Sequence, residues 1–189
     1  LFAPIKDKLM YITDGGTVVR TPDRILKTYP MSNELWKDMC RMVRDELPAC
    51  DYFAASPDLC YAEDGASPIF HRLRDSYGFE MREIDDLTKL ENDDIIKFTV
   101  YHPDSCEELC SPHFIPAWKD KAHVTSAGKE WVDCNRSGIS KWTAVSFLMD
   151  KYNIAPDEVC CFGDNLNDTE MLKGAGESYA VSNARPEVI

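Results

Sequence analysis

Short apolar runs separated by turn residues open the chain and predict β-structure there. Leu9 to Thr13 is apolar and β-prone, and Asp14-Gly15-Gly16 directly after it predicts a tight turn. The segments 17–20 and 25–29 then flank Thr21-Pro-Asp-Arg24, which is typical of a hairpin with proline in its turn. The first 29 residues therefore predict a strand followed by a hairpin.

Helical periodicity begins at Ser32, which is a favourable N-cap residue. A helix is predicted from Ser32 to Leu47, because Leu35, Met39, Met42 and Val43 form one apolar stripe and Pro48 ends the pattern. Further strands are predicted at 51–55, 59–62, 95–101, 123–126 and 131–133, and further helices at 67–77 and 106–118. The hairpin is thus followed by an αββαβαββ pattern.

After Cys134 the pattern changes to alternating helices and strands. Helices are predicted at 140–152, with a stripe of Ala144, Val145, Leu148, Met149 and Tyr152, and at 168–175, closed by Gly176; strands are predicted at 159–162 and 178–181. The first of these strands is entirely apolar, which favours burial on both faces in a parallel sheet between helices. The fold class is therefore α/β, with a Rossmann-like part beside an α+β part.

Charge and cysteine content narrow the class of protein. The net charge is −12, and the 21 basic residues are scattered, so a nucleic acid is not an expected partner. No apolar run approaches the roughly 20 residues of a membrane span. The eight cysteines include no Cys-x-x-Cys pair and follow no signal peptide, which predicts free thiols in a cytoplasmic protein. Cys106, Cys110, His102 and His113 lack the spacing of a structural zinc site.

The candidate chemistry lies at the end of the strand 159–162. Ligands bind beyond the carboxyl ends of strands in open α/β sheets, and Asp164 comes directly after this strand. Asp168 follows four residues later at the start of a helix, with Asn165 and Asn167 between them. Two carboxylates in a short loop suit Mg²⁺, which completes its coordination with water and substrate phosphate. Both aspartates also have a structural alternative, because Asp is common after strands and at helix N-termini.

Lys141 is the second candidate. It falls at the first position of a predicted helix, where the helix dipole disfavours a cation. If that helix begins at the same edge of the sheet, the Lys141 ammonium can reach a phosphate that also contacts the metal at Asp164. The alternative is an exposed lysine at a frayed helix start.

Four segments carry a resemblance to a known family. They are Ser137-Gly-Ile-Ser-Lys-Trp-Thr-Ala144, Phe162-Gly-Asp-Asn-Leu-Asn-Asp168, Glu170-Met-Leu-Lys-Gly-Ala-Gly176 and Ala180-Val-Ser-Asn-Ala184. In order and spacing they resemble the third and fourth motifs of Cof-type haloacid dehalogenase (HAD) hydrolases. The resemblance implies a core strand and cap entry at 1–16, an α+β class IIB cap at 17–135 that closes over the active site, and a partial Rossmann-like core at 136–189.

The same resemblance implies roles for individual residues. Family members use an Asp nucleophile, an Asp acid/base two residues later, Mg²⁺, and a Lys that steadies the nucleophile and the phosphate. Lys141 takes the Lys role, Asp164 is a metal ligand, Asp168 is a direct or water-mediated metal ligand, and Asn167 contacts the phosphate side. The implied substrate is a small phosphorylated metabolite, such as a sugar phosphate.

Two family motifs are absent from the sequence. The family's first motif ends Asp-x-Asp-Gly-Thr, but the nearest segment here, Tyr11 to Thr17, has Ile12 at the nucleophile position. This segment resembles instead the family's entry from core to cap, with Gly15 in place of the usual Asn. The second motif is missing as well. We therefore expect a fragment of a longer parent that carries both motifs, and we expect these 189 residues alone to be inactive.

Two further functions compete with phosphatase activity. One is a non-catalytic protein that binds metal or phosphate and has lost the nucleophile, and the other is a phosphomutase of the same superfamily. The sequence does not indicate the oligomeric state. Cap loops set specificity in this family, and the segments Glu63 to Ser67 and Glu130-Trp131 are candidates for contact with the substrate.

Overall fold

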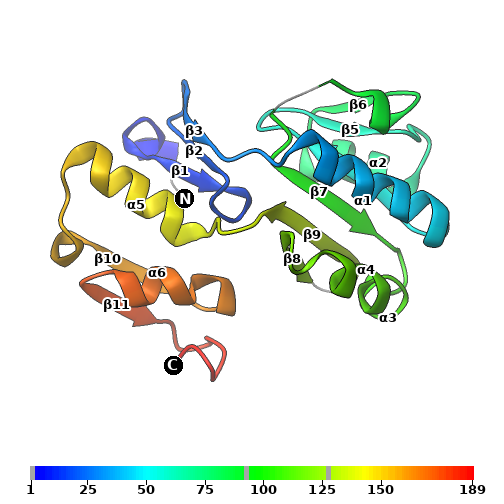
Figure 1. Ribbon diagram of the computed structural model, residues 1–189. Helices are drawn as coiled ribbons and strands as arrows, with labels where there is room; N and C mark the ends of the chain where they lie inside the picture. Colours follow the sequence, from blue (N-terminus) through cyan, green and yellow to red (C-terminus); the bar gives the residue numbers. More distant parts are fainter. Residues whose placement is uncertain (1–2, 92–93, 127–128) are drawn as a thin grey trace. The chain divides into compact units, whose positions relative to one another are not determined.

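The computed structural model describes residues 3–91, 94–126 and 129–189. These residues form two compact units, which we call the split unit, Leu1–Lys27 with Ile139–Ile189, and the central unit, Thr28–Gly138. We had expected the cap to begin at residue 17 and end at 135. The strand at 18–20 pairs with the first strand, and the strand at 25–28 lies next to it in the same three-stranded sheet, so residues 17–27 group with the split unit (Figure 1).

The central unit is a six-stranded mixed sheet with helices on both faces. Its strands are β4 (Asp51–Ala55), β5 (Cys60–Ala62), β6 (Met81–Glu83), β7 (Lys97–Tyr101), β8 (Ala122–Ser126) and β9 (Trp131–Arg136). Its helices are α1 (Asn33–Glu46), α2 (Pro68–His71), α3 (Cys106–Leu109) and α4 (Ser111–Trp118), with a π-helical turn η3 (Arg72–Ser76) and a 3-10 turn η4 (Leu87–Lys89). The strand order is β6-β5-β4-β7-β9-β8, and only β5 and β6 pair in parallel.

Two apolar clusters stabilise this sheet, one on each face. The larger one joins α1, α3 and α4 to the sheet through buried residues such as Trp36, Phe98 and Phe114. The smaller one joins α2 and η3 to the opposite face through Phe53 and Ile69. Burial of this much apolar side-chain surface gives the central unit a core of its own.

Two predictions for the central unit were incomplete. The strand β6 was not predicted, because its Met-Arg-Glu sequence is short and polar; it forms through a parallel register in which Met81 lies opposite Cys60. The single helix predicted at 106–118 is two helices that meet at Cys110. Pro112 explains the second start, because proline fits the first turn of a helix, where its missing N–H is not needed.

The split unit contains two small sheets. A three-stranded sheet holds β1 (Tyr11–Thr13), β2 (Val18–Arg20) and β3 (Ile25–Thr28), and a parallel pair holds β10 (Cys160–Gly163) and β11 (Glu177–Ala180). The helices are α5 (Lys141–Tyr152) and α6 (Thr169–Gly174), with 3-10 turns η1 (Ala3–Lys8), η2 (Asp14–Gly16), η5 (Pro156–Glu158) and η6 (Leu166–Asp168). Each strand and helix predicted here is present, within a few residues of its predicted bounds.

Burial of β10 on both faces was a wrong prediction. Cys160 and Phe162 are exposed, Phe162 by 65%, whereas Cys161 and Gly163 are buried. The strand is therefore covered on one face, where α6 packs, and in the described part of the chain Phe162 stacks on Tyr179 on the open face with ring centroids 5.3 Å apart. An all-apolar run had indicated a covered strand, but the packing partners decide which face is buried.

The composition predicted free cysteines and no membrane-spanning segment. All eight cysteines are free, as predicted, and seven of them are buried. Among the described helices, none combines the length and the apolar character needed to cross a membrane.

Candidate functional site

Asp168 organises the loop that follows β10. Its side chain is buried, with 3% of the residue exposed. The Oδ2 atom accepts hydrogen bonds from the backbone N–H groups of Asp164 at 3.0 Å and Asn165 at 3.2 Å. The chain from β10 into η6 is thereby folded around one carboxylate, which fixes the backbone position of Asp164.

The second oxygen of Asp168 binds Lys141. The Lys141 Nζ atom donates to Oδ1 at 2.5 Å, and this ion pair joins residues 27 positions apart. Lys141 is the first residue of α5, which is capped by Ser140 through a reciprocal pair of hydrogen bonds with Thr143. A rigid helix start thus presents the ammonium group to the loop, and the structure brings Lys141 and Asp168 together, a pairing that the sequence did not predict.

The charges of this pair support each other. Burial raises the pKa of Asp168, but the hydrogen bond from Lys141 and those from the Asp164 and Asn165 amides outweigh burial, so the pKa lies below its ordinary value. Asp168 is therefore ionised at neutral pH. The side chain of Lys141 remains one third exposed, so its ammonium can also meet a ligand from solvent.

Two glycines make this geometry possible. A Cβ atom on Gly163 would lie 2.6 Å from the Asp168 Cβ, so only glycine leaves room for Asp168 under the end of β10. Gly16 has φ +107, and a Cβ there would lie 2.1 Å from the backbone oxygen of Ser140, so η2 packs directly on the start of α5. The sequence places Gly16 in a tight turn, but its close approach to Ser140 involves a distant segment and is visible only in the structure.

Asp164 and Asn167 point to solvent. Both residues are exposed, and within the described residues no side chain pairs with the Asp164 carboxylate or the Asn167 amide. Asn165 differs, because its Oδ1 accepts the Leu166 N–H at 2.8 Å and so caps η6. The structure thus separates an organising carboxylate, Asp168, from a free carboxylate, Asp164.

The residues present fit a magnesium ion only in part. No group of three His, Cys, Asp or Glu side chains placed to hold a metal occurs among the described residues. Mg²⁺ does not need such a cage, because it typically takes one or two carboxylates and keeps several waters. The free carboxylate of Asp164 suits direct coordination, whereas both oxygens of Asp168 already accept hydrogen bonds.

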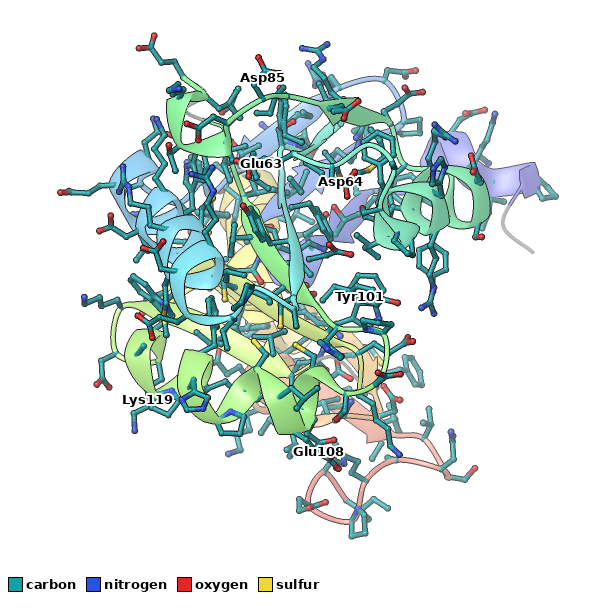
Figure 2. The ribbon with its side chains drawn as sticks, turned by 90° about the vertical axis from the view of Figure 1, so that its right-hand side faces the viewer. Glu63, Asp64, Asp85, Tyr101, Glu108 and Lys119 are labelled. Carbon is teal, nitrogen blue, oxygen red and sulfur yellow. The ribbon has the colours of Figure 1, made fainter. Side chains whose placement is uncertain are left out.

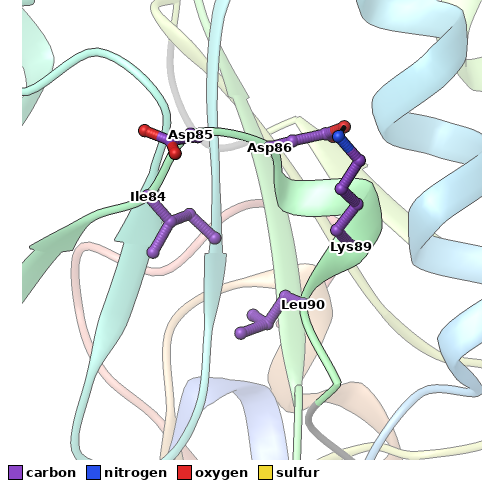
Figure 3. A pocket seen from close by; sticks show the side chains of 5 residues that line it. All are labelled: Ile84, Asp85, Asp86, Lys89 and Leu90. Atoms are coloured by element: carbon purple, nitrogen blue, oxygen red, sulfur yellow. Dashed lines mark ion pairs between the residues drawn. The ribbon is translucent and has the colours of Figure 1, made fainter.

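The central unit holds a separate pocket of about 330 Å³, lined by Ile84, Asp85, Asp86, Lys89 and Leu90 (Figure 3). One of its two aspartates, Asp86, is paired with Lys89 at 3.3 Å and with Arg44 at 2.6 Å. Arg44 also pairs with Glu63, which accepts the Tyr52 hydroxyl at 2.5 Å. These satisfied charges favour a structural network.

The two cap segments expected to contact substrate are partly engaged in similar pairs. Glu63, which Figure 2 labels beside Asp64, is tied to Arg44 as described. Glu130 pairs with Arg72 at 2.9 Å, and the Arg72 guanidinium lies 5.6 Å from the Trp131 ring centroid.

Comparison with known proteins places the chain in a family. The family model of haloacid dehalogenase-like hydrolases matches residues 1–189. This chain belongs to that family. A protein from Eubacterium rectale, known from a crystal structure, is 76% identical in sequence to this chain. The two structures match with a TM-score of 0.92 over 100% of this chain and 71% of the Eubacterium rectale chain. The HAD assignment and the α/β fold with a cap are therefore confirmed.

More distant HAD relatives include named phosphatases. The 5-amino-6-(5-phospho-D-ribitylamino)uracil phosphatase YbjI of Escherichia coli is 25% identical over 192 residues, which are 100% of this chain and 69% of YbjI. The HAD subclass IIB sugar phosphatase BT4131 shares the fold, with a TM-score of 0.75, 16% identity, and coverage of 99% of this chain and 70% of that one. The chain thus spans about seven tenths of these relatives.

Proposed function

We propose that this chain provides the magnesium-binding and phosphate-binding part of a phosphatase that acts on small phosphorylated metabolites. The observation that carries the proposal is the Lys141–Asp168 ion pair beside the free carboxylate of Asp164 at the end of β10. Membership of the HAD hydrolases and similarity to phosphatases such as YbjI support it. Eight free cysteines are consistent with a cytoplasmic protein.

Each residue has a distinct proposed role. Asp164 coordinates Mg²⁺ directly, and Asp168 holds the loop and contacts the metal directly or through a water molecule. Lys141 donates from its ammonium group to a phosphate oxygen, and Asn167 contacts the phosphate from the exposed side of the loop. The metal, when bound, neutralises negative charge on the phosphoryl group.

We propose that the nucleophile is not among these 189 residues. Because the 189 residues contain no Asp-x-Asp sequence, we propose that they do not hydrolyse phosphate esters by themselves. In a longer protein that joins this chain to an Asp-x-Asp strand, the first aspartate would attack phosphorus while the ester P–O bond breaks, and the second aspartate would give the leaving alcohol its proton. Water would then attack the aspartyl-phosphate, giving its proton back to the second aspartate and releasing inorganic phosphate and the free carboxylate. Lys141 and Asp164 would position and neutralise the phosphoryl group for both steps.

Phosphate release tests this function. A panel of phosphorylated sugars, nucleotides and cofactors is incubated with this chain, and with a longer protein that carries it and an Asp-x-Asp strand, in Mg²⁺ and in EDTA. We expect release only from the longer protein and only with Mg²⁺. In that protein Asp164→Ala or Lys141→Ala should lower kcat about 100-fold or more, since lost transition-state charge contacts cost this much.

Asp150→Ala is the matched control, because Asp150 is an exposed carboxylate on α5, and it should retain full activity. Magnesium-dependent turnover by the 189 residues alone would refute the assignment of the nucleophile. Unchanged kcat in Asp164→Ala would refute the proposed site.

The missing motif also favours a second function, a HAD-like protein that binds metal or phosphate without catalysis. It would bind phosphate through Lys141 yet release none from any ester, even in the longest protein that contains the chain. A phosphomutase would instead move phosphate between positions of a sugar without releasing it, which product analysis in the same experiment distinguishes.

A further inference from the structure

A basic pocket occupies the part of the central unit where the chain enters and leaves it. The pocket has a volume of about 480 Å³ and is lined by Pro30, Met31, Ser32, Leu35, Lys121, Arg136 and Ser137. Residues 30–32 follow β3, and residues 136–137 end β9 and precede α5, as the ribbon in Figure 1 shows. The cavity therefore contacts both connecting segments of the central unit.

The two cations of this pocket have no acidic partner. In the described part of the chain neither Lys121 nor Arg136 forms an ion pair, although the protein carries a net charge of −12. Lys121 lies over the Trp118 ring at 5.1 Å, and Arg136 lowers the pKa of Tyr29, which burial raises more strongly. By contrast, Arg41, Arg44, Arg72 and Arg74 each pair with a carboxylate.

The remaining walls add apolar surface and a helix terminus. Met31 is 4% exposed and belongs to the apolar core, and Leu35 packs against that core. Ser32 caps α1, a helix of 14 residues whose dipole adds partial positive charge at this end. The closest acids in sequence, Glu34 and Asp120, do not line the cavity.

We propose that this pocket binds a small organic phosphate, with the phosphate on Arg136 and Lys121 and the organic part against Met31 and Leu35. Arginine and lysine are the side chains that bind phosphate most strongly, and the cavity is larger than an inorganic ion needs. The pocket shares no residue with the Lys141 loop, since all of its residues belong to the central unit. The proposal does not depend on phosphatase activity.

The test is an NMR titration of the whole chain with phenyl phosphate and, separately, with inorganic phosphate. The chain carries Lys141→Gln, and the buffer contains EDTA at constant ionic strength, so that the Lys141 loop does not contribute. We expect saturable shifts of the Met31, Ser32 and Ser137 amides and of the Met31 methyl. Phenyl phosphate should bind more tightly than inorganic phosphate, because it also covers the apolar wall.

Arg136→Gln with Lys121→Gln should weaken binding of phenyl phosphate about tenfold or more, since each charged hydrogen bond is worth about that factor. Lys119→Gln is the matched control, because Lys119 lies two residues from Lys121 outside the pocket (Figure 2 labels it), and it should bind as the parent does. Matching spectra before titration would show that each variant is folded. The proposal is overturned if the amides of Met31 and Ser137 do not shift, or if their shifts survive in the double variant.

Discussion

The helices α1 and α5 have similar lengths and N-caps, but they are buried very differently. In α1, Trp36, Met39, Cys40 and Val43 are completely buried against the six-stranded sheet of the central unit. In α5, only Ala144 and Met149 are buried, and Tyr152 is 44% exposed. An apolar stripe therefore predicts a helix in both units, whereas the depth of burial depends on the area of the partner surface.

The polar clusters of the two units also differ, in whether their charges are paired. In the central unit, Arg44 pairs with the carboxylates of Glu63 and Asp86, which favours a structural role. In the split unit, Asp168 and Lys141 are paired, but the neighbouring Asp164 carboxylate is left exposed. An organised loop that presents an unpaired charge is the arrangement that a ligand-binding site requires.

The largest expected effect is on the core of the central unit. Trp36→Ala should reduce the free energy of unfolding of this unit by about 3–5 kcal/mol, because it removes a large, completely buried side chain. Urea unfolding followed by resolved NMR signals of the central unit measures the change. Tyr152→Ala in α5 should cost at most about 1 kcal/mol. Equal losses in the two variants would contradict the difference in burial.

A smaller effect is expected at the loop of the split unit. Gly163→Ala should destabilise this unit by about 1–3 kcal/mol, because the new methyl group meets the Asp168 side chain. Loss of the downfield-shifted Asp164 amide signal would report the displaced carboxylate. Ser178→Ala on the exposed neighbouring strand should leave both quantities unchanged. An unshifted Asp164 amide in Gly163→Ala would show that Asp168 does not need this space.

The smallest effect concerns pH and the central unit. The Arg44 side chain, followed by Thr88, holds the pKa of Asp86 well below its ordinary value despite some burial. Its stabilising contribution is therefore complete above the unfolded carboxyl pKa of about 3.9 and is lost as the pH falls toward the folded pKa. The free energy of unfolding of the central unit, measured in urea from pH 7 to 3, should fall less steeply with decreasing pH in Asp86→Asn than in the parent. Identical pH dependence in the two proteins would show that the Asp86 carboxylate does not stabilise the folded unit.

Much of the fold follows from local sequence patterns, and the exceptions depend on distant contacts. Ser32 caps α1 as predicted, since N-caps depend on a few neighbouring residues, and Ser140 caps α5 in the same way. The strand β6 was missed because Met81 pairs with Cys60, a contact that no local pattern encodes. The open face of β10 was missed for a related reason, since the sequence shows apolar character but not what covers it.

The sequence identified the candidate residues of the site but not the contacts that each of them makes. Lys141, Asp164 and Asp168 were identified from motif spacing and from the unfavourable place of a lysine at a helix start. That Asp168 binds Lys141 and two loop amides, while Asp164 remains free, depends on the packing of α5 near the loop. The need for glycine at 163 became clear only from the position of Asp168 beneath it.

Paramagnetic broadening by Mn²⁺, used in place of Mg²⁺, tests the central claim most directly, because it detects weak binding in a chain without the nucleophile. Substoichiometric Mn²⁺ should broaden the amide signals of Asp164 and Asn165 first, and excess Mg²⁺ should restore them. Asp164→Asn should abolish the effect, whereas Asp150→Asn should preserve it. Broadening that begins elsewhere, or that persists in Asp164→Asn, would contradict a metal site at the end of β10.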